Sequence, residues 1–336
     1  MTALDRLISR FSERRVVVLG DMVADEYLVG RPTRISREAP VLILALHESF
    51  VRPGGATNTA YNLCTLGAHT TVVGVIGDDE VGSRLTAALA QRGMATEGLI
   101  VDPNRPTSTS MRVVARGAQD IQQQVVRVDR IERSAVAPAV ADSMLERALA
   151  AFEQADAVVF SDYDHGVISE ELIAACIPRA RDLGIAIIVD SHGDLYRFKG
   201  VTAATPNQPE AAATVGRPLE SESELDAAGR ELVEGMDAHG VLVTRGVDGI
   251  ALYERGGELY RLPVALADQR DVVDATGAGD TVAAAFTLAL TSGATMRQAA
   301  YLANVAGGAA VRRLGAATLT PPELNEALKN CSLPRP

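Results

Sequence analysis

The sequence predicts an α/β fold with a mostly parallel central sheet, helices on both faces of that sheet, and a small β-sheet lid. Three observations support this fold class. Short β-branched runs recur along the chain, amphipathic stretches of helical length separate them, and two regions carry paired strand-like runs with no helix between them. Strands that alternate with helices of this length form βαβ units, whose strands run parallel.

The expected sheet strands are short and rich in valine and isoleucine, as strands buried on both faces are. They cover residues 15–19, 71–76, 157–160, 185–189 and 241–244. The helices expected between them carry their apolar side chains on one stripe. These helices cover residues 57–66, 81–91, 139–151, 170–182 and 222–237.

The lid is expected from residues 27–51 and 109–129, where strand-like runs follow each other directly. No proline-rich linker, low-complexity tract or repeat of fixed period divides the sequence. We therefore expect residues 1–336 to form a single domain that carries the lid.

The composition narrows the function. A net charge of -11 does not provide the basic surface that nucleic-acid binding requires. The cysteines, Cys64, Cys176 and Cys331, lie far apart and have no histidine at ligand spacing, so neither a disulfide framework nor a zinc site is indicated. No apolar run is long enough to span a bilayer and no leader-like segment is visible. We expect a cytoplasmic protein with no membrane or nucleic-acid partner.

Lysine usage excludes two large classes of phosphotransferase. The lysines are Lys199 and Lys329, and neither lies in a Gly-x4-Gly-Lys-Ser/Thr loop or in the strand and catalytic-loop signatures of protein kinases. If the protein transfers phosphoryl groups, other residues must do so.

The lid segments are rich in arginine although the protein as a whole is acidic. Residues 31–52 and 112–133 hold nine arginines and five carboxylates. The arginines are Arg31, Arg34, Arg37, Arg52, Arg112, Arg116, Arg127, Arg130 and Arg133. Guanidinium groups bind phosphate bidentately, which favours a phosphorylated small ligand. A solvated, arginine-rich surface is the alternative interpretation.

The strongest local pattern is Asp274-Ala-Thr-Gly-Ala-Gly-Asp280, followed by an apolar helical stretch over residues 281–290. Glycines at a helix start leave free N–H groups that bind an anion. Asp280 is then placed to accept the proton of a hydroxyl, while Gly277, Ala278 and Gly279 hold the transferred phosphoryl group. An ordinary glycine-rich turn is one alternative. A dinucleotide-binding loop is another, although its third glycine would fall at Val282.

This heptapeptide resembles the second signature of the ribokinase/PfkB sugar kinases. The segment Gly54-Gly-Ala-Thr-Asn58-Thr-Ala-Tyr-Asn-Leu-Cys-Thr-Leu-Gly67 resembles the first signature. The resemblance implies that Gly54 and Gly55 bring the backbone close to a sugar and that Asn58 binds its hydroxyl groups. A structural cap for the helix beginning at Thr59 is the alternative role of Asn58.

Further matches follow in the order of the family. Gly20-Asp21-Met-Val-Ala-Asp25 follows the first strand, which implies that Asp21 and Asp25 bind sugar hydroxyls. Thr205-Pro-Asn207-Gln-Pro-Glu210 resembles an Asn-x-x-Glu element, which implies that Asn207 and Glu210 organise Mg²⁺ and phosphates through water. A helix cap with a first-turn glutamate is the alternative. The nucleotide-binding side is matched by Thr244, Gly246, Gly249 and Asn304.

Within the family, the chain is most similar to the kinase module of bacterial enzymes that phosphorylate D-glycero-D-manno-heptose 7-phosphate at C1. The similarity rests on Arg34-Ile-Ser36-Arg-Glu38-Ala-Pro-Val41, Gln123-Gln-Val-Val-Arg127-Val-Asp129, Ser161-Asp162-Tyr163 and Val189-Asp190. It implies that the lid arginines Arg112 and Arg127 bind a phosphorylated substrate. It covers nearly the whole chain.

Two positions depart from the heptose kinases, because His165 and His192 stand where those enzymes usually have lysine. Imidazole is shorter than a lysine side chain and is mostly neutral at pH 7. We expect an altered handling of phosphate at these positions. Exposed loop residues without ligand contact are the alternative, and a paired metal site is a weaker one.

The resemblance implies an ATP-dependent sugar kinase that uses Mg²⁺ and a monovalent cation such as K⁺ near the Asp274 loop. It also implies a homodimer formed through the lids. One alternative keeps this chemistry with another sugar or a nucleoside as substrate. An alternative of another class is a non-catalytic sensor that binds ATP and sugar on the same fold, which the two lost lysines suggest.

Overall fold

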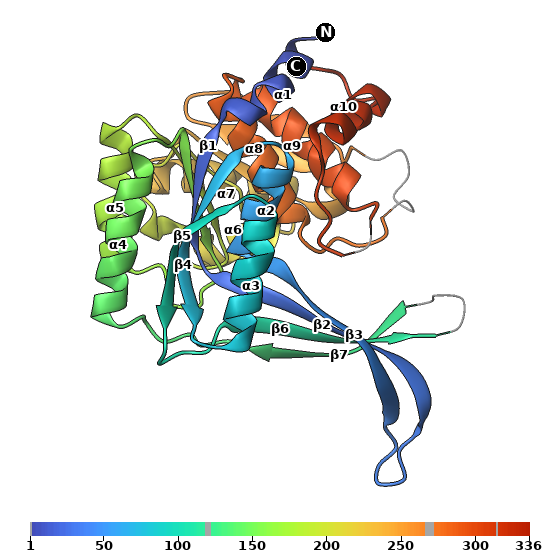
Figure 1. Ribbon diagram of the computed structural model, residues 1–336. Coiled ribbons are helices and arrows are strands. Elements are labelled where there is room, and N and C mark those ends of the chain that lie inside the picture. Colours follow the sequence, from blue (N-terminus) through green and yellow to red (C-terminus); the bar gives the residue numbers. More distant parts are fainter. Residues whose placement is uncertain (1, 118–121, 266–271, 314) are drawn as a thin grey trace.

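The computed structural model describes residues 2–117, 122–265, 272–313 and 315–336 (Figure 1). Within these residues the main sheet has nine strands in the order β13-β12-β11-β10-β9-β8-β1-β4-β5. The strands are β1 (Arg15–Gly20), β4 (His69–Gly77), β5 (Ala95–Asp102), β8 (Ala157–Asp162), β9 (Ala186–Ser191), β10 (Ala203–Ala204), β11 (Gly240–Thr244), β12 (Ile250–Glu254) and β13 (Tyr260–Leu262).

The seven strands from β11 to β5 in this order are parallel, and only β12 and β13 run antiparallel at one edge. The central strand β1 is buried from Val16 onward. Its side chains alternate between two cores, with Val16 and Val18 in one and Val17 and Leu19 in the other. This period of two, with both faces apolar, is the pattern of a strand covered by helices on both sides.

Helices cover both faces of the main sheet (Figure 1). One face carries α1 (Ala3–Ser9), α2 (Ala56–Thr65), α3 (Glu80–Gln91), α8 (Ala278–Thr291), α9 (Met296–Ala310) and α10 (Pro321–Asn330). The other face carries α4 (Pro138–Phe152), α5 (Glu170–Asp182), α6 (Gln208–Val215) and α7 (Glu222–Gly235). Among the described residues, no helix has both the length and the apolar character required to cross a bilayer.

A second sheet of four strands, the lid, projects from the body (Figure 1). Its order is β3-β2-β6-β7, with β2 (Met22–Ile35), β3 (Leu42–Gly55), β6 (Ser108–Arg116) and β7 (Gln122–Arg130). The predicted fold class, a mostly parallel sheet with a lid, is confirmed. The strand β2 starts at Met22, earlier than expected, and β3 ends at Gly55, directly before α2. The inner end of the lid therefore adjoins the carboxyl end of β1, where ligands bind in open α/β sheets.

Candidate active site

A cavity of about 570 Å³ lies between the inner end of the lid and the carboxyl ends of the parallel strands. Segments far apart in the sequence contribute to its wall. Of the residues predicted from the sequence, the wall contains Asp25, Gly54, Gly55, Asn58, Arg112, Arg127, Asn207, Glu210, Thr244, Gly277, Gly279 and Asp280. The residues predicted to bind the sugar and those predicted to bind the phosphates therefore line the same cavity.

Asp280 lies in the first turn of α8 with only 6% of its surface exposed. Its Oδ2 accepts a hydrogen bond from Asn58 Nδ2 at 2.6 Å, and its Oδ1 accepts bonds from Thr59 Oγ1 at 2.7 Å and Tyr163 Oη at 2.9 Å. Burial raises the pKa of Asp280, although the three donors favour its ionised form. The result is a fixed, weakly solvated carboxylate, as a general base requires.

The helix terminus beside Asp280 depends on glycine. Gly277 caps α8 with a φ of 74°, and a Cβ at this position would meet Asn58 Nδ2 at 2.7 Å. A Cβ on Gly279 would meet nothing within 4 Å. This open space adjoins the cavity, so a phosphoryl group can approach the backbone here.

Fewer backbone N–H groups are free to bind a phosphoryl group at the start of α8 than the sequence suggested. The N–H of Ala278 donates to the Ala275 carbonyl at 3.2 Å, because the chain turns tightly before the helix. Among the hydrogen bonds of the described residues, none uses the N–H of Gly279. The same is true of the N–H of Gly277 among the described residues, so Gly277 and Gly279, which both line the cavity, are better placed than Ala278 to donate to an anion.

Asp25 and Arg112 form a nearly buried ion pair at the lid end of the cavity. Arg112 Nη1 lies 2.7 Å from Asp25 Oδ1. Burial raises the pKa of Asp25 despite the opposing guanidinium of Arg112. A Cβ on Gly54 would meet the Asp25 carboxylate at 2.8 Å, so glycine leaves room for this side chain. Both members of the pair remain in the cavity wall.

Asp21 is not among the residues that line this cavity, and its role in binding sugar hydroxyls stays a prediction. It is 1% exposed, and its Oδ2 accepts the backbone N–H groups of Tyr163 at 2.7 Å and His165 at 3.3 Å. Burial, reinforced by the nearby Asp162, raises the pKa of Asp21 to about 7. Through Oδ2 the Asp21 side chain anchors the loop that carries Tyr163, while its Oδ1 is buried without a hydrogen-bond partner among the described residues.

A group of acids lines the wall opposite the lid. Burial raises the pKa of Asp190 well above its usual range, and the charges of Asp280 and Glu210 add to that effect. Asn207 and Glu210 form a capping box at the start of α6, in which Asn207 Oδ1 accepts the Glu210 N–H at 2.9 Å. Both also face the cavity, so the capping and ligand-binding interpretations are compatible. Asp190 was not among the predicted site residues.

The two unusual histidines have different environments. His192 is half-exposed, packs against Tyr163 with the ring centroids 4.4 Å apart and the planes tilted by 33°, and places Nε2 3.6 Å from Glu210 Oε1. His165 is 6% exposed, and burial together with Arg133 lowers its pKa to about 4. Among the described residues, no three His, Cys, Asp or Glu side chains are arranged to hold a metal ion. A paired-histidine metal site is therefore not supported.

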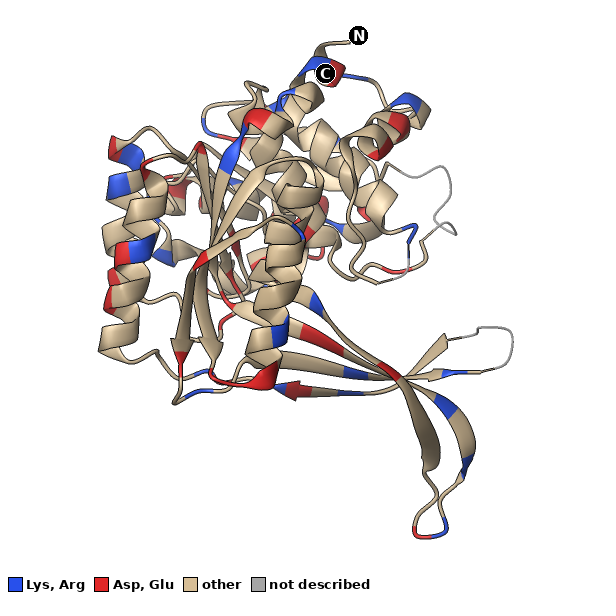
Figure 2. Ribbon diagram, viewed as in Figure 1, with Lys and Arg blue, Asp and Glu red and all other residues tan. Residues whose placement is uncertain are grey.

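The lid arginines are largely paired with carboxylates. Arg127 Nε lies 2.7 Å from Asp129 Oδ1, and Arg130 Nη2 lies 3.3 Å from Asp79 Oδ2. Figure 2 shows basic and acidic residues along the same lid strands. The positive field toward the cavity is therefore weaker than the count of arginines suggested, although Arg112, Arg127 and Arg133 line the wall.

A second cavity of about 170 Å³ adjoins the first and is mostly apolar. Its wall includes Gly246, Gly249, Ala278 and Asn304, and it shares Thr244, Ala275 and Gly279 with the first cavity. All four residues predicted for the nucleotide side, Thr244, Gly246, Gly249 and Asn304, therefore meet here. An apolar cavity with Gly279 in its wall suits a nucleotide base whose phosphates point toward Asp280.

Residues 13–323 match the model of the pfkB family of carbohydrate kinases. The chain belongs to this family. It is therefore an ATP-dependent carbohydrate kinase, and the resemblance expected from its signatures is confirmed.

Individual pfkB relatives agree with this assignment. The bifunctional protein HldE of Citrifermentans bemidjiense is 38% identical over 324 residues, which cover 95% of this chain and 65% of that protein. The HldE of Gluconacetobacter diazotrophicus is 40% identical over 309 residues, covering 92% of this chain and 62% of that protein. The chain thus spans slightly less than two thirds of the length of these relatives.

Solved structures confirm the fold of the pfkB kinase. Phosphofructokinase-2 from Escherichia coli in complex with fructose-6-phosphate has a TM-score of 0.75 at 21% identity, and the match covers 95% of this chain and 99% of that one. Arabidopsis thaliana ribokinase complexed with ribose and ATP has a TM-score of 0.69 at 22% identity, covering 96% and 99% of the two chains.

Two hydrogen-bond partners of Asp280 were missed from the sequence, Thr59 and Tyr163. Thr59 directly follows the predicted Asn58, and Tyr163 lies in one of the segments shared with the heptose kinases.

The variant Tyr163→Phe tests the hydrogen bond from Tyr163 to Asp280. Loss of the donor raises the pKa of Asp280, so the acid limb of the kcat–pH profile should move up by about one pH unit. Activity at pH 6 should fall more than at pH 8. A profile identical to that of the wild type would contradict the contact.

Proposed function

We propose that this pfkB kinase transfers the γ-phosphoryl group of ATP to the anomeric hydroxyl of a sugar such as D-glycero-D-manno-heptose 7-phosphate. The observation that supports the mechanism is the buried Asp280 carboxylate, held by three donors at the start of α8 and open to the cavity. The shared segments with the heptose kinases and the similarity to HldE proteins support the substrate.

In this proposal each residue of the site has a separate role in the reaction. Asp280 accepts the hydroxyl proton as the oxygen attacks the γ-phosphorus, and the Gly279 N–H at the helix terminus stabilises the negative charge on the moving phosphoryl group. Asn58 and Tyr163 hold the carboxylate so that it does not rotate away from the hydroxyl. The base of ATP occupies the apolar second cavity.

The acids of the wall fit a magnesium ion bound through water. The charges of Asp280 and Glu210 raise the pKa of Asp190, and the charge of Asp280 raises that of Glu210, a repulsion that a divalent cation would relieve. Glu210 and Asn207 are the residues we assign to this role. When bound, Mg²⁺ neutralises phosphate charge.

We also propose a monovalent cation, such as K⁺, near the Asp274 loop. The Asp274 carboxylate accepts backbone N–H groups from Thr276 and Gly315, each at 2.9 Å, and so ties two loop segments together. A cation bound beside this loop would order the same segments. Comparing kcat in potassium and in tetramethylammonium buffers tests this, and equal rates would reject it.

The lid supports a homodimer. Large apolar side chains lie exposed on its strands and hairpin, among them Ile35, Val41, Leu46, Val126 and Val128. Several large apolar side chains exposed on one small sheet favour a protein contact. We propose that the lid of a second copy covers it. Sedimentation equilibrium measures this directly, and a monomer at micromolar concentration would oppose it.

Arg127→Ala tests the phosphorylated substrate. If Arg127 contacts the sugar phosphate, the variant should raise KM for heptose 7-phosphate by about tenfold or more, since a charge-assisted bond is lost. Its effect on neutral sugars such as ribose or fructose should be small.

A second candidate function is a kinase for an unphosphorylated sugar. The pairing of Arg112 with Asp25 and of Arg127 with Asp129 favours this candidate. Equal losses for charged and neutral sugars would favour that candidate.

A further inference from the structure

His165 lies in the cavity wall with one ring nitrogen sealed inside the protein. Its Nδ1 is buried and has no hydrogen-bond partner. The residue as a whole is 6% exposed. Nε2 is not among the buried atoms without a partner, and the residue lines the cavity.

The position of His165 is fixed by its backbone. Its N–H donates to Asp21 Oδ2 at 3.3 Å, and its carbonyl accepts Arg105 Nη2 at 3.0 Å. The same loop is held at Asp162, whose carboxylate accepts bonds from the Asp164 N–H at 3.0 Å and Ser191 Oγ at 2.9 Å.

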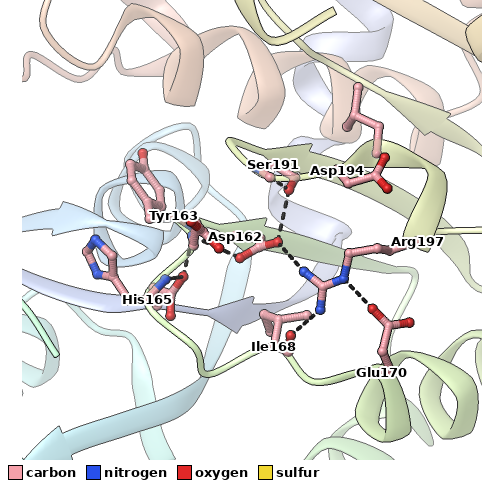
Figure 3. Close-up of polar contacts among 12 residues, drawn as sticks. Asp162, Tyr163, His165, Ile168, Glu170, Ser191, Asp194 and Arg197 are labelled. Carbon is pink, nitrogen blue, oxygen red and sulfur yellow. Dashed lines mark hydrogen bonds and ion pairs between the residues drawn. The ribbon is translucent and has the colours of Figure 1, made fainter. Parts of the chain in front are cut away.

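Arg197 also holds the loop that carries Asp162 and His165. Its Nη1 lies 3.3 Å from Asp162 Oδ2, and its Nε donates to Glu170 at 2.5 Å. Figure 3 shows the ring of His165 on the side of Asp162 away from Arg197. The imidazole therefore belongs to a rigid wall and not to a mobile loop, so it can select between ligands.

The sealed Nδ1 keeps the ring uncharged. An imidazolium carries an N–H on both nitrogens, and here the second N–H would be buried without an acceptor. The surrounding charges act in the same direction, because Arg133 and Arg105 oppose protonation and outweigh Asp164. His192 also opposes it. A neutral ring with Nδ1 unprotonated presents a single donor, the Nε2–H, to the cavity.

We propose that His165 is a specificity-determining residue that recognises an uncharged hydroxyl of the sugar through its Nε2–H. A lysine at this position would instead offer a positive charge to phosphate. The phosphate of a sugar phosphate is then left to Arg112 and Arg127. This inference rests on the proposed sugar kinase function and adds the class of group that this wall recognises.

The test compares a charged and an uncharged ligand on the same variants. Steady-state assays give KM for heptose 7-phosphate, and competition gives Ki for the unphosphorylated heptose. His165→Ala should raise both constants by the same factor, about tenfold, with KM for ATP unchanged. His165→Gln retains an uncharged donor and should stay within about threefold of the wild type. His69→Ala, an exposed histidine on β4, is the matched control and should change neither constant.

Two results would overturn the proposal. A loss confined to the phosphorylated sugar would show that His165 contacts phosphate, and no loss in folded His165→Ala would show that it contacts no ligand group. If the wild type does not use heptose 7-phosphate, the proposed substrate fails instead. The same two constants are then measured with another pair of sugars that the wild type binds, either fructose 6-phosphate and fructose or ribose 5-phosphate and ribose. His165→Ala should again raise both constants by the same factor.

Discussion

Replacing Asp280 with asparagine should lower kcat for sugar phosphorylation by about 100-fold or more. Asparagine has the size of aspartate and can still accept bonds from Thr59 and Tyr163, but it cannot take up the hydroxyl proton. KM for ATP should stay within about threefold, since the apolar nucleotide cavity is not altered. ADP release under saturating substrates measures the first effect, and calorimetric binding of ATP measures the second.

An exposed acid provides the control for this prediction. Asp182, at the end of α5, is exposed and distant in the fold from the cavity, so Asp182→Asn should retain the wild-type kcat. If Asp280→Asn turns over at nearly the wild-type rate, Asp280 is not the base. If it loses ATP binding as well, the Asp280 side chain has a structural role besides that of a base.

Gly279→Ala should reduce kcat/KM for ATP by about 100-fold without destabilising the protein. The added methyl group meets no protein atom within 4 Å, so it projects into the open space shared by both cavities. A phosphoryl group displaced by about 1 Å from the attacking hydroxyl loses a rate factor of this size. Alanine is also a better helix former than glycine, so the melting temperature should not fall.

The melting temperature separates two explanations of a loss at Gly279. A slow variant with an unchanged or higher Tm locates the phosphoryl group at this helix terminus. A variant with a lowered Tm would instead indicate that Gly279 is required for folding, and a fully active one would show that the phosphoryl group passes elsewhere.

Local signals made part of this structure predictable. The strand β1 and the helix α8 follow from apolar runs with clear boundaries, and the glycines before Asp280 correctly placed that residue in a first helical turn. The two-residue strand β10 carries no such signal, because two alanines in a row show no period. It exists because its neighbours β9 and β11 pair with it.

Contacts across the fold were not predictable from residue types. Asp280 meets Tyr163 and Thr59 across separations of 117 and 221 residues, which only the packing of α2, α8 and the loop after β8 determines. The arginines of the lid were counted as free charge, but Arg112 lies on β6 beside β2, and this pairing puts it against Asp25. Asp21, four residues earlier, turns into the protein instead.

A structure of the protein with a non-hydrolysable ATP analogue and heptose 7-phosphate tests the role of Asp280 most directly. We expect the anomeric oxygen to lie about 2.6–3.2 Å from an Asp280 carboxylate oxygen, with the terminal phosphoryl group over Gly279. A complex in which the sugar's anomeric hydroxyl points away from Asp280, with another residue within proton-transfer distance, would contradict it.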